Sequence, residues 1–211
     1  MPFLRDGPED AFATILLAHG AGAPMDSAAM NAIANVLAGV GFRVARFELA
    51  YMAARREGVR KPPPRAELLQ GEYRTAVDEL GSTGPLIIGG KSMGGRMASM
   101  VADPLFADGR IVGLLCLGYP FHPPAKPQQL RTAHLAGLKT PTLIVQGTRD
   151  PFGTKSEVST YDLSDRIEIA WLEDGDHDLK PRKRVSGLSA SDHLDELARI
   201  AEIWARRVVA G

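Results

Sequence analysis

A serine flanked by glycines follows a short apolar run in the middle of the chain. The sequence Gly-Lys-Ser-Met-Gly at 90–94 has the form G-x-S-x-G, and it lies between the apolar residues 85–88 and a helical pattern. In so tight a turn the serine adopts a strained backbone conformation, and the glycines avoid collisions between strand and helix. The spacing predicts that Ser92 is a nucleophile and that the amide of Met93 faces the negative charge that forms on a substrate carbonyl.

The same residues have two alternative interpretations. Gly-Lys-Ser also ends the phosphate-binding motif G-x-x-x-x-G-K-[ST], but the first glycine of that motif would fall on Pro85, and 86–88 is expected to be strand rather than loop. A glycine-rich turn with an incidental serine is the second alternative. The position of the motif between a strand and a helix favours the nucleophile.

A second segment of small residues, His-Gly-Ala-Gly at 19–22, follows the first apolar run of the chain. Hydrolases with a G-x-S-x-G turn place a second oxyanion amide at this point, and we expect Ala21 to supply it. Gly20 and Gly22 would let a carbonyl group approach the backbone. Taken alone, the segment is more typical of a turn that ends a strand, with a satisfied histidine. Its place in the strand order favours the oxyanion role.

A serine nucleophile needs a base and an acid, which in this arrangement follow it in the order acid, then histidine. Asp150 lies in the loop after the apolar run 141–145, and His177 follows the run 167–172. Both side chains would emerge at the same sheet edge as Ser92, so the carboxylate can orient the imidazole while the imidazole takes the serine proton.

Other acids and histidines compete for these roles. Asp174 and Asp176 are alternative acids, less favoured because they neighbour the histidine in sequence. His193 lies in the last helical pattern and is expected to be a packing or surface residue, and His134 follows a proline-rich loop. His122 lies within that loop and is expected to line the substrate pocket.

The apolar runs alternate with helical patterns, which is the order expected of a parallel sheet covered by helices on both faces. We predict a three-layer α/β/α sandwich with a mostly parallel sheet of about six strands. The expected strands are 13–18, 42–47, 85–88, 111–117, 141–145 and 167–172. The expected helices are 26–37, 65–80, 93–102, 155–163 and 190–209. Two long proline-containing connections, 48–64 and 118–140, are expected to be functional loops.

Composition excludes several classes of protein. The 211 residues suit one domain, 1–211, and 45% apolar with 24% charged residues is typical of a globular fold. With 25 basic and 25 acidic side chains the net charge is zero, so we expect no nucleic-acid partner and no membrane partner. A single cysteine, Cys116, in an apolar run and scattered histidines predict no metal and no organic cofactor. The N-terminus has no signal-peptide pattern and no apolar run reaches about 18 residues, which predicts a cytoplasmic protein.

Six motifs together resemble those of the compact α/β-hydrolases related to dienelactone hydrolase, in the branch that includes a testis-expressed hydrolase-like protein and a subunit of a histone-acetyltransferase complex. They span nearly the whole chain: 19–22, 51–56, 89–96, 118–124, 146–153 and 175–177. The resemblance implies Ser92, Asp150 and His177 as a catalytic triad, and a flap at 119–124 where larger hydrolases insert a lid domain.

On the same basis Tyr51, Tyr119 and Phe121 join Gly20, Gly22 and His122 as expected pocket residues. Only about a dozen residues precede the first expected strand, so the antiparallel N-terminal strands of larger relatives are expected to be missing.

These residues predict a hydrolase of small carboxylic esters or thioesters that forms an acyl-enzyme on Ser92. Two alternatives stay open: a scaffold of the same fold that acts through a protein partner, and acyl transfer to an acceptor other than water. The basic segment 55–61 is typical of a solvated loop; a further hypothesis is that Arg55 or Arg56 meets an acidic group on the substrate.

Overall fold

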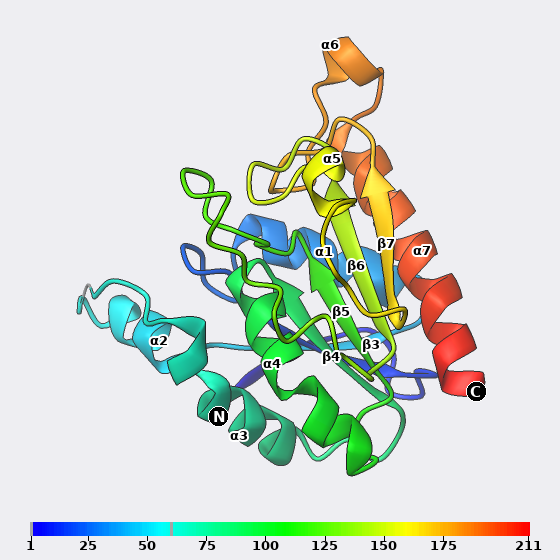
Figure 1. Ribbon diagram of the computed structural model, residues 1–211. Coiled ribbons are helices and arrows are strands. Elements are labelled where there is room, and N and C mark those ends of the chain that lie inside the picture. The colour runs from blue at the N-terminus through cyan, green and yellow to red at the C-terminus, as the bar shows by residue number, and fades with distance from the viewer. Residues whose placement is uncertain (1, 60) are drawn as a thin grey trace.

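A computed structural model describes residues 2–59 and 61–211 of the chain. It contains a seven-stranded sheet with the strand order β1-β3-β2-β4-β5-β6-β7 (Figure 1). The strands are β1 (Phe3–Asp6), β2 (Thr14–Ala18), β3 (Arg43–Phe47), β4 (Leu86–Lys91), β5 (Gly113–Leu117), β6 (Thr142–Gly147) and β7 (Ile167–Leu172). Every neighbouring pair is parallel except β1 and β3.

Helices occupy most of the connections between the strands. They are α1 (Ala28–Gly39), α2 (Ala50–Arg56), a single 3₁₀ turn (Ala66–Leu68), α3 (Gln70–Leu80), α4 (Met93–Ala107), α5 (Lys155–Val158), α6 (Lys183–Ser186) and α7 (Ala190–Ala210). None of the described helices is both long enough and apolar enough to cross a lipid bilayer.

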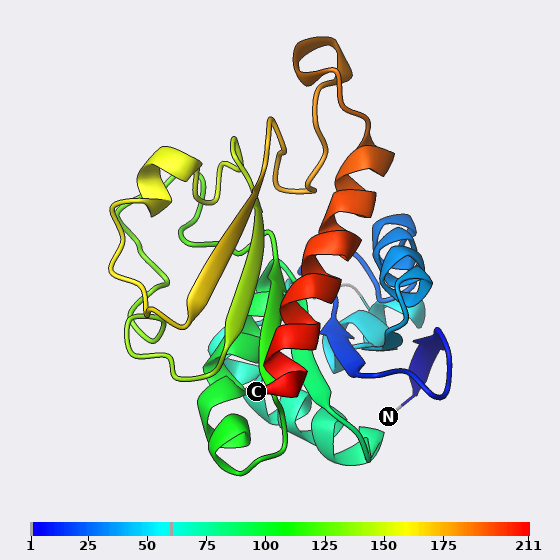
Figure 2. The same cartoon turned by 90° about the vertical axis from the view of Figure 1, so that its right-hand side faces the viewer.

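The helices form two layers, one on each face of the sheet, as Figures 1 and 2 show from two sides. Helices α1 and α7 pack against each other on one face, where Leu37 and Trp204 belong to one apolar core. Helices α3 and α4 pack on the other face, where Tyr73 and Met97 belong to a second core. The predicted three-layer architecture with a mostly parallel sheet is therefore confirmed.

The central strands carry apolar side chains on both faces because helices cover both sides of the sheet. All six residues of β4 are buried, and its last residues, Gly89, Gly90 and Lys91, still pair with β2 or β5. The strand thus extends three residues beyond the expected 85–88. The chain turns into α4 at the carboxyl edge of the sheet, where the loops after the parallel strands gather (Figure 1).

The expectation that no antiparallel strand precedes the core was wrong. Phe3–Asp6 pairs antiparallel with β3, and Arg46 of β3 forms an ion pair with Asp6 at 2.8 Å. A strand at the edge of a sheet exposes unpaired backbone groups, and four residues are enough to cover β3. The result is seven strands where about six were expected.

Further elements differ from the expected pattern, among them the short helix α6, which was not expected. The connection 48–64 contains α2, which buries Tyr51 and Met52, so this connection is not an irregular loop throughout. The helix expected over 155–163 ends at Val158. By contrast, the connection 118–140 has no helix or strand, as expected of a long functional loop.

Candidate active site

Ser92 occupies a sharp turn between β4 and α4. Its backbone angles are φ 52° and ψ −117°, an unfavourable conformation for a residue with a side chain, and its amide donates to the carbonyl of Leu117 at 2.9 Å. A Cβ atom on Gly90 would lie 2.5 Å from the carbonyl oxygen of Ala18, and one on Gly94 would lie 2.4 Å from the same oxygen. Only glycine fits at these two positions, because strand and helix approach so closely.

The side chains of Ser92, His177 and Asp150 form one hydrogen-bonded chain. His177 Nε2 lies 2.8 Å from Ser92 Oγ, and His177 Nδ1 lies 2.9 Å from Asp150 Oδ2. An ionised carboxylate only accepts hydrogen bonds, so Nδ1 carries the proton and Nε2 is left to accept the serine hydroxyl. Although Ser92 is the N-cap residue of α4, its side chain makes no capping hydrogen bond. The structure thus brings together the three residues that the sequence selected.

Asp150 is fully buried, and its carboxylate is held from three directions. The amide of Phe152 donates to Oδ1 at 2.9 Å, while Gln146 Nε2 and the His177 ring both donate to Oδ2. Gln146 is itself fixed by Tyr119, whose amide donates to Gln146 Oε1 at 2.7 Å. Sequence reasoning missed Gln146; its signal was a polar residue at the end of an otherwise apolar strand.

Phe152 covers the imidazole as well as capping the carboxylate. Its ring centroid lies 4.1 Å from that of His177, with 30° between the planes. Such close stacking limits rotation of the imidazole and keeps Nε2 directed at Ser92.

Lys91, the residue before the serine, is a second side chain that sequence reasoning missed. Only 8% of it is exposed, and Nζ donates to the carbonyl oxygen of His177 at 2.6 Å, with Asp178 Oδ1 3.6 Å away. Burial lowers the pKa of this ammonium below the ordinary value, although the neighbouring carboxylates of Asp178 and Asp150 oppose the shift. Lys91 therefore ties the loop that carries the imidazole to the turn that carries the hydroxyl.

The segment 19–22 lies beside the serine: a Cβ on Gly20 would be 3.8 Å from Ser92 Cβ. His19 is fully buried. Its Nε2 accepts from the amide of Leu49 at 3.2 Å, so Nδ1 carries the proton and donates to the carbonyl of Gly20 at 2.7 Å. Burial lowers the pKa of His19, which keeps the ring neutral. His19 is thus the satisfied histidine of the alternative interpretation, and it fixes the loop that carries Ala21.

Ala21 and Met93, whose amides were expected to face a substrate carbonyl, both line the cleft beside Ser92. Met93 is the first residue of α4, so its N–H has no partner within the helix and carries the positive end of the helix dipole. The Ala21 N–H shares its peptide unit with the Gly20 carbonyl, which accepts from His19 Nδ1 at 2.7 Å. The Ala21 carbonyl accepts from Tyr51 Oη at 3.0 Å, so the peptide units on both sides of Ala21 are held in place. Burial raises the pKa of Tyr51 to about 12, so the phenol stays protonated as a donor.

The competing acids and histidines have other partners. Arg182 donates to the carboxylate of Asp174, and these hydrogen bonds lower the pKa of Asp174 to about 2. Asp176 Oδ1 accepts from the amides of Asp178 and Lys180. His193 is buried with Nδ1 2.8 Å from the carbonyl of Leu179, as expected of a packing residue.

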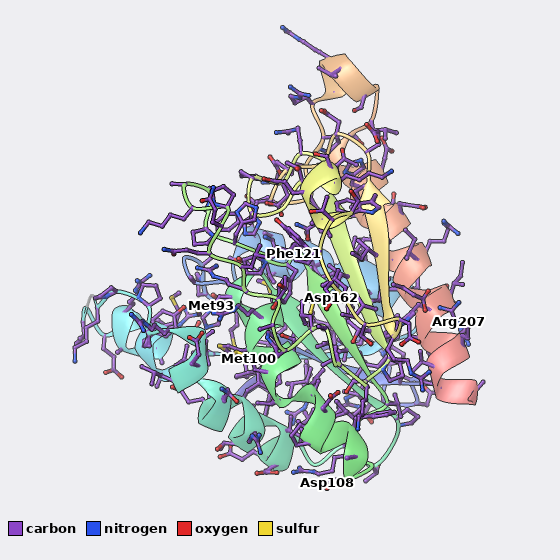
Figure 3. The ribbon with its side chains drawn as sticks, in the orientation of Figure 1. Met93, Met100, Asp108, Phe121, Asp162 and Arg207 are labelled. Atoms are coloured by element: carbon purple, nitrogen blue, oxygen red, sulfur yellow. The ribbon has the colours of Figure 1, made fainter. Side chains whose placement is uncertain are left out.

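A cleft of about 580 Å³ opens in front of Ser92. Its walls come from the segment 63–67, the start of α4, the loop 120–131 and Phe152: Ala21, Pro63, Pro64, Arg65, Ala66, Glu67, Ser92, Met93, Arg96, Pro120, Pro123, Gln129, Leu130, Arg131 and Phe152. In Figure 3 the labelled Met93 and Phe121 lie near the end of α4 that faces this site, and Asp108 marks its other end.

None of the six expected pocket residues, Gly20, Gly22, Tyr51, Tyr119, Phe121 and His122, lines this cleft. Tyr119, Phe121 and His122 are almost completely buried and support the loop from beneath. Gly22 lines a neighbouring hollow with Arg55 and Arg56. Among residues 2–59 and 61–211, no three His, Cys, Asp or Glu side chains come together where they could hold a metal ion.

Comparison with known proteins agrees with this architecture. A protein of Pongo abelii named "Putative protein-lysine deacylase ABHD14B" is 29% identical over 152 residues, which cover 72% of this chain and 69% of that protein. A dienelactone hydrolase from Anabaena variabilis has a TM-score of 0.73 at 20% identity, covering 97% of this chain and 90% of its own. A Xanthomonas campestris protein described as a serine hydrolase without lid has a TM-score of 0.70 at 16% identity, covering 99% and 89%.

At these identities the two solved structures show a shared fold, and the narrower branch inferred from the motifs stays a prediction. The family model described as "Alpha/beta hydrolase domain" matches residues 11–206, which is most of the chain. The chain belongs to the α/β-hydrolase family.

Proposed function

We propose that this protein is a serine hydrolase that cleaves small carboxylic esters or thioesters through an acyl-enzyme on Ser92. The observation that carries the proposal is the hydrogen-bonded chain from Ser92 Oγ through His177 to the buried carboxylate of Asp150. This arrangement lets a serine hydroxyl lose its proton to a neutral imidazole while the carboxylate stabilises the imidazolium that forms.

The steps follow from the positions of these groups. His177 Nε2 takes the hydroxyl proton as Ser92 Oγ attacks the carbonyl carbon, and the carbonyl oxygen becomes an oxyanion facing the amides of Ala21 and Met93. His177 then gives the proton to the departing alcohol or thiol, which leaves the acyl group on Ser92. A water molecule, activated by the same imidazole, releases the acid and restores the hydroxyl.

The cleft supports a small substrate. Its volume of about 580 Å³ lies within the range of small-molecule sites, and its walls combine prolines and Leu130 with a few charged side chains. Because 118–140 has no helix or strand, it forms a rim rather than a lid domain.

A fluorophosphonate probe tests the proposal directly. Wild-type protein should be labelled covalently and should hydrolyse para-nitrophenyl esters of graded chain length. Ser92→Ala should abolish both, and His177→Ala should reduce both strongly. Ser82→Ala, in the connection between α3 and β4, is the matched control and should behave as wild type. An unlabelled wild type with background esterase activity would favour the scaffold alternative.

The Pongo abelii relative adds a second candidate substrate class. Its printed name refers to removal of acyl groups from protein lysines. The same serine, imidazole and oxyanion amides can attack an amide carbonyl, so acyl-lysine peptides belong in the substrate screen, with deacylation followed by mass spectrometry. Loss of deacylation in Ser92→Ala, but not in Ser82→Ala, would assign it to this site.

A further inference from the structure

Positive charge gathers on the walls of the cleft beside Ser92. Three arginines line it, Arg65, Arg96 and Arg131, and the one acidic side chain among the lining residues is Glu67. Arginines in a substrate cleft either hold the protein together through carboxylate partners or remain available to a ligand. The partners of each side chain decide between these roles.

Arg96 is placed by α4. It lies one helical turn after Ser92, and its amide donates to the Ser92 carbonyl at 3.1 Å, so the two side chains project from the same face of the helix. Its side chain is 14% exposed and pairs with Glu67, which is 47% exposed. The buried Nε of Arg96 has no hydrogen-bond partner in the described part of the chain. Glu67 therefore satisfies one end of this guanidinium and leaves the other unsatisfied.

Arg131 is fixed through its backbone rather than through its charge. Its amide donates to the carbonyl of Phe121 at 2.7 Å, and its carbonyl accepts from Tyr119 Oη at 3.0 Å. Within residues 2–59 and 61–211 its guanidinium takes part in no hydrogen bond or ion pair. Burial and the neighbouring Arg96 lower the pKa of this side chain, as expected where two like charges share a site. The cleft thus holds a positioned guanidinium without a counter-ion.

We propose that Arg131 and Arg96 form a subsite for a carboxylate carried by the substrate, so that the favoured esters are half-esters of short dicarboxylic acids. The inference deepens the proposed function and rests on it. After Glu67 is counted against Arg96, Arg131 contributes one uncompensated positive charge near Ser92, and a single carboxylate matches it. The exposed Arg65 lies at the cleft as well, and among the described residues Glu67 is the one acidic side chain that lines it.

Spacing along α4 sets the expected length of the acyl chain. Arg96 lies four residues, about 6 Å, from Ser92 along the helix axis. A carboxylate that meets the guanidinium while its ester carbonyl meets Ser92 Oγ must therefore be separated from that carbonyl by a few methylene groups, as in glutarate.

The two arginines suggested by the sequence for this purpose have other partners. Arg56 pairs with Glu48 and Asp26. Arg55 donates to the carbonyl of Lys61 and lies over the Tyr51 ring at 5.5 Å. Neither lines the cleft in front of Ser92, and Arg60 of the same basic segment lies outside the described residues. The charge that faces the nucleophile comes from α4 and from the loop 120–131.

Matched pairs of substrates test the subsite. Ethyl hydrogen glutarate is compared with the ethyl ester of glutaric monoamide, which has the same shape without the charge, and kcat/KM is measured by acid release. A second pair carries the group on the alcohol side: butanoyloxyacetic acid and its amide. We expect wild-type protein to prefer the acid of the glutarate pair by about 10- to 100-fold, the usual effect of a charge-assisted hydrogen bond.

Substitutions separate the subsite from general charge effects. Arg131→Gln should bring the preference close to 1, and Arg131→Lys, which keeps the charge without the planar fork, should retain part of it. The backbone hydrogen bonds of residue 131 survive both changes. Arg110→Gln is the matched control: it removes an arginine that pairs with Asp78, away from the cleft, and should keep the wild-type preference.

The outcomes distinguish the subsite from the proposed function. A preference for the acid of the glutarate pair that depends on Arg131 supports the subsite. A preference confined to the butanoyloxyacetic acid pair overturns the assignment to half-esters, because the anion then lies on the alcohol side. Ser92-dependent hydrolysis with equal rates on acids and amides overturns the subsite and leaves the hydrolase intact. If no ester is turned over, the proposed function fails. Binding of ethyl hydrogen glutarate is then measured by calorimetry on Ser92→Ala and on the double variant Ser92→Ala with Arg131→Gln. Equal affinity for these two variants, or no detectable binding, overturns the subsite too.

Discussion

Replacing Lys91 by Met tests whether the buried ammonium tunes the imidazole of His177. A Cβ built on Gly118 would lie 3.2 Å from Lys91 Nζ and 3.6 Å from His177 Nδ1. The two nitrogens are therefore within about 7 Å of each other, where two unit charges repel by roughly 2 kcal/mol at an effective dielectric constant of about 20 and by roughly 0.6 kcal/mol in bulk water. Lys91→Met removes this repulsion, so protonation of the imidazole becomes easier.

The expected result is a displaced pH profile. At 1.36 kcal/mol per pH unit, the acid limb of kcat/KM should move upward by about 0.4 to 1.5 units. The plateau should also fall by about 10-fold, because the His177 carbonyl loses a charge-assisted hydrogen bond and the loop loses its tie to β4. The free energy of unfolding should change little, because removal of a buried charge offsets the loss of the hydrogen bond to the His177 carbonyl.

The assay is hydrolysis of a para-nitrophenyl ester between pH 5 and 9, together with urea unfolding of each variant. Lys139→Met serves as the control for net charge, because Lys139 is exposed and precedes β6, at the edge of the sheet away from the site. If the acid limb stays in place while the plateau of kcat/KM falls, the ammonium of Lys91 does not influence protonation of the imidazole. Lys91 would then act only through its hydrogen bond to the His177 carbonyl. A large loss of stability would refute the claim that its burial is costly.

Three further changes test other parts of the site. Asp150→Asn should lower kcat by about a thousand- to ten-thousand-fold by favouring the wrong imidazole tautomer, with an unchanged circular dichroism spectrum. Gly94→Ala places a methyl group 2.4 Å from the Ala18 carbonyl oxygen and should lower the free energy of unfolding by about 1–3 kcal/mol in urea titrations, whereas Gly84→Ala, with open space around it, should not. Burial lowers the pKa of His19 from 6.5, so the unfolded chain binds a proton at this imidazole more readily than the folded protein does. The free energy of unfolding should therefore fall as the pH drops below about 6.5. In His19→Gln the decrease in the free energy of unfolding between pH 7 and 5 should be smaller.

The residues of the hydrogen-bonded chain could be selected from the sequence because each sits at the end of a parallel strand. The apolar runs locate the strand ends, and parallel strands bring their carboxyl ends to one edge, so Ser92, Asp150 and His177 had to converge. The glycines around the serine were equally informative, since strand and helix at this turn leave no space for side chains.

Other features depend on contacts between distant segments, which local patterns do not encode. The four-residue strand β1 exists because the edge of β3 needs a partner. Helix α2 is short, has no side-chain cap and lies in a basic, proline-rich stretch, so its formation depends on burying Tyr51 and Met52. Tyr119 and Phe121 belong to a loop whose side chains could face either the cleft or the core. Both side chains are fully buried in the core, and the sequence alone does not show which of the two directions they take.

The groups that would make and break bonds come from the sheet edge, whereas most of the wall that meets the substrate comes from 63–67 and 120–131. The second of these segments is anchored by backbone hydrogen bonds, such as that from Arg131 to Phe121, which do not depend on side-chain identity. Residues such as Gln129 and Leu130 can therefore change without disturbing the machinery behind them. Substrate selectivity and catalytic reactivity therefore depend on different segments. Substitutions confined to 63–67 and 120–131 can change which acyl groups are accepted while the reacting groups stay in place.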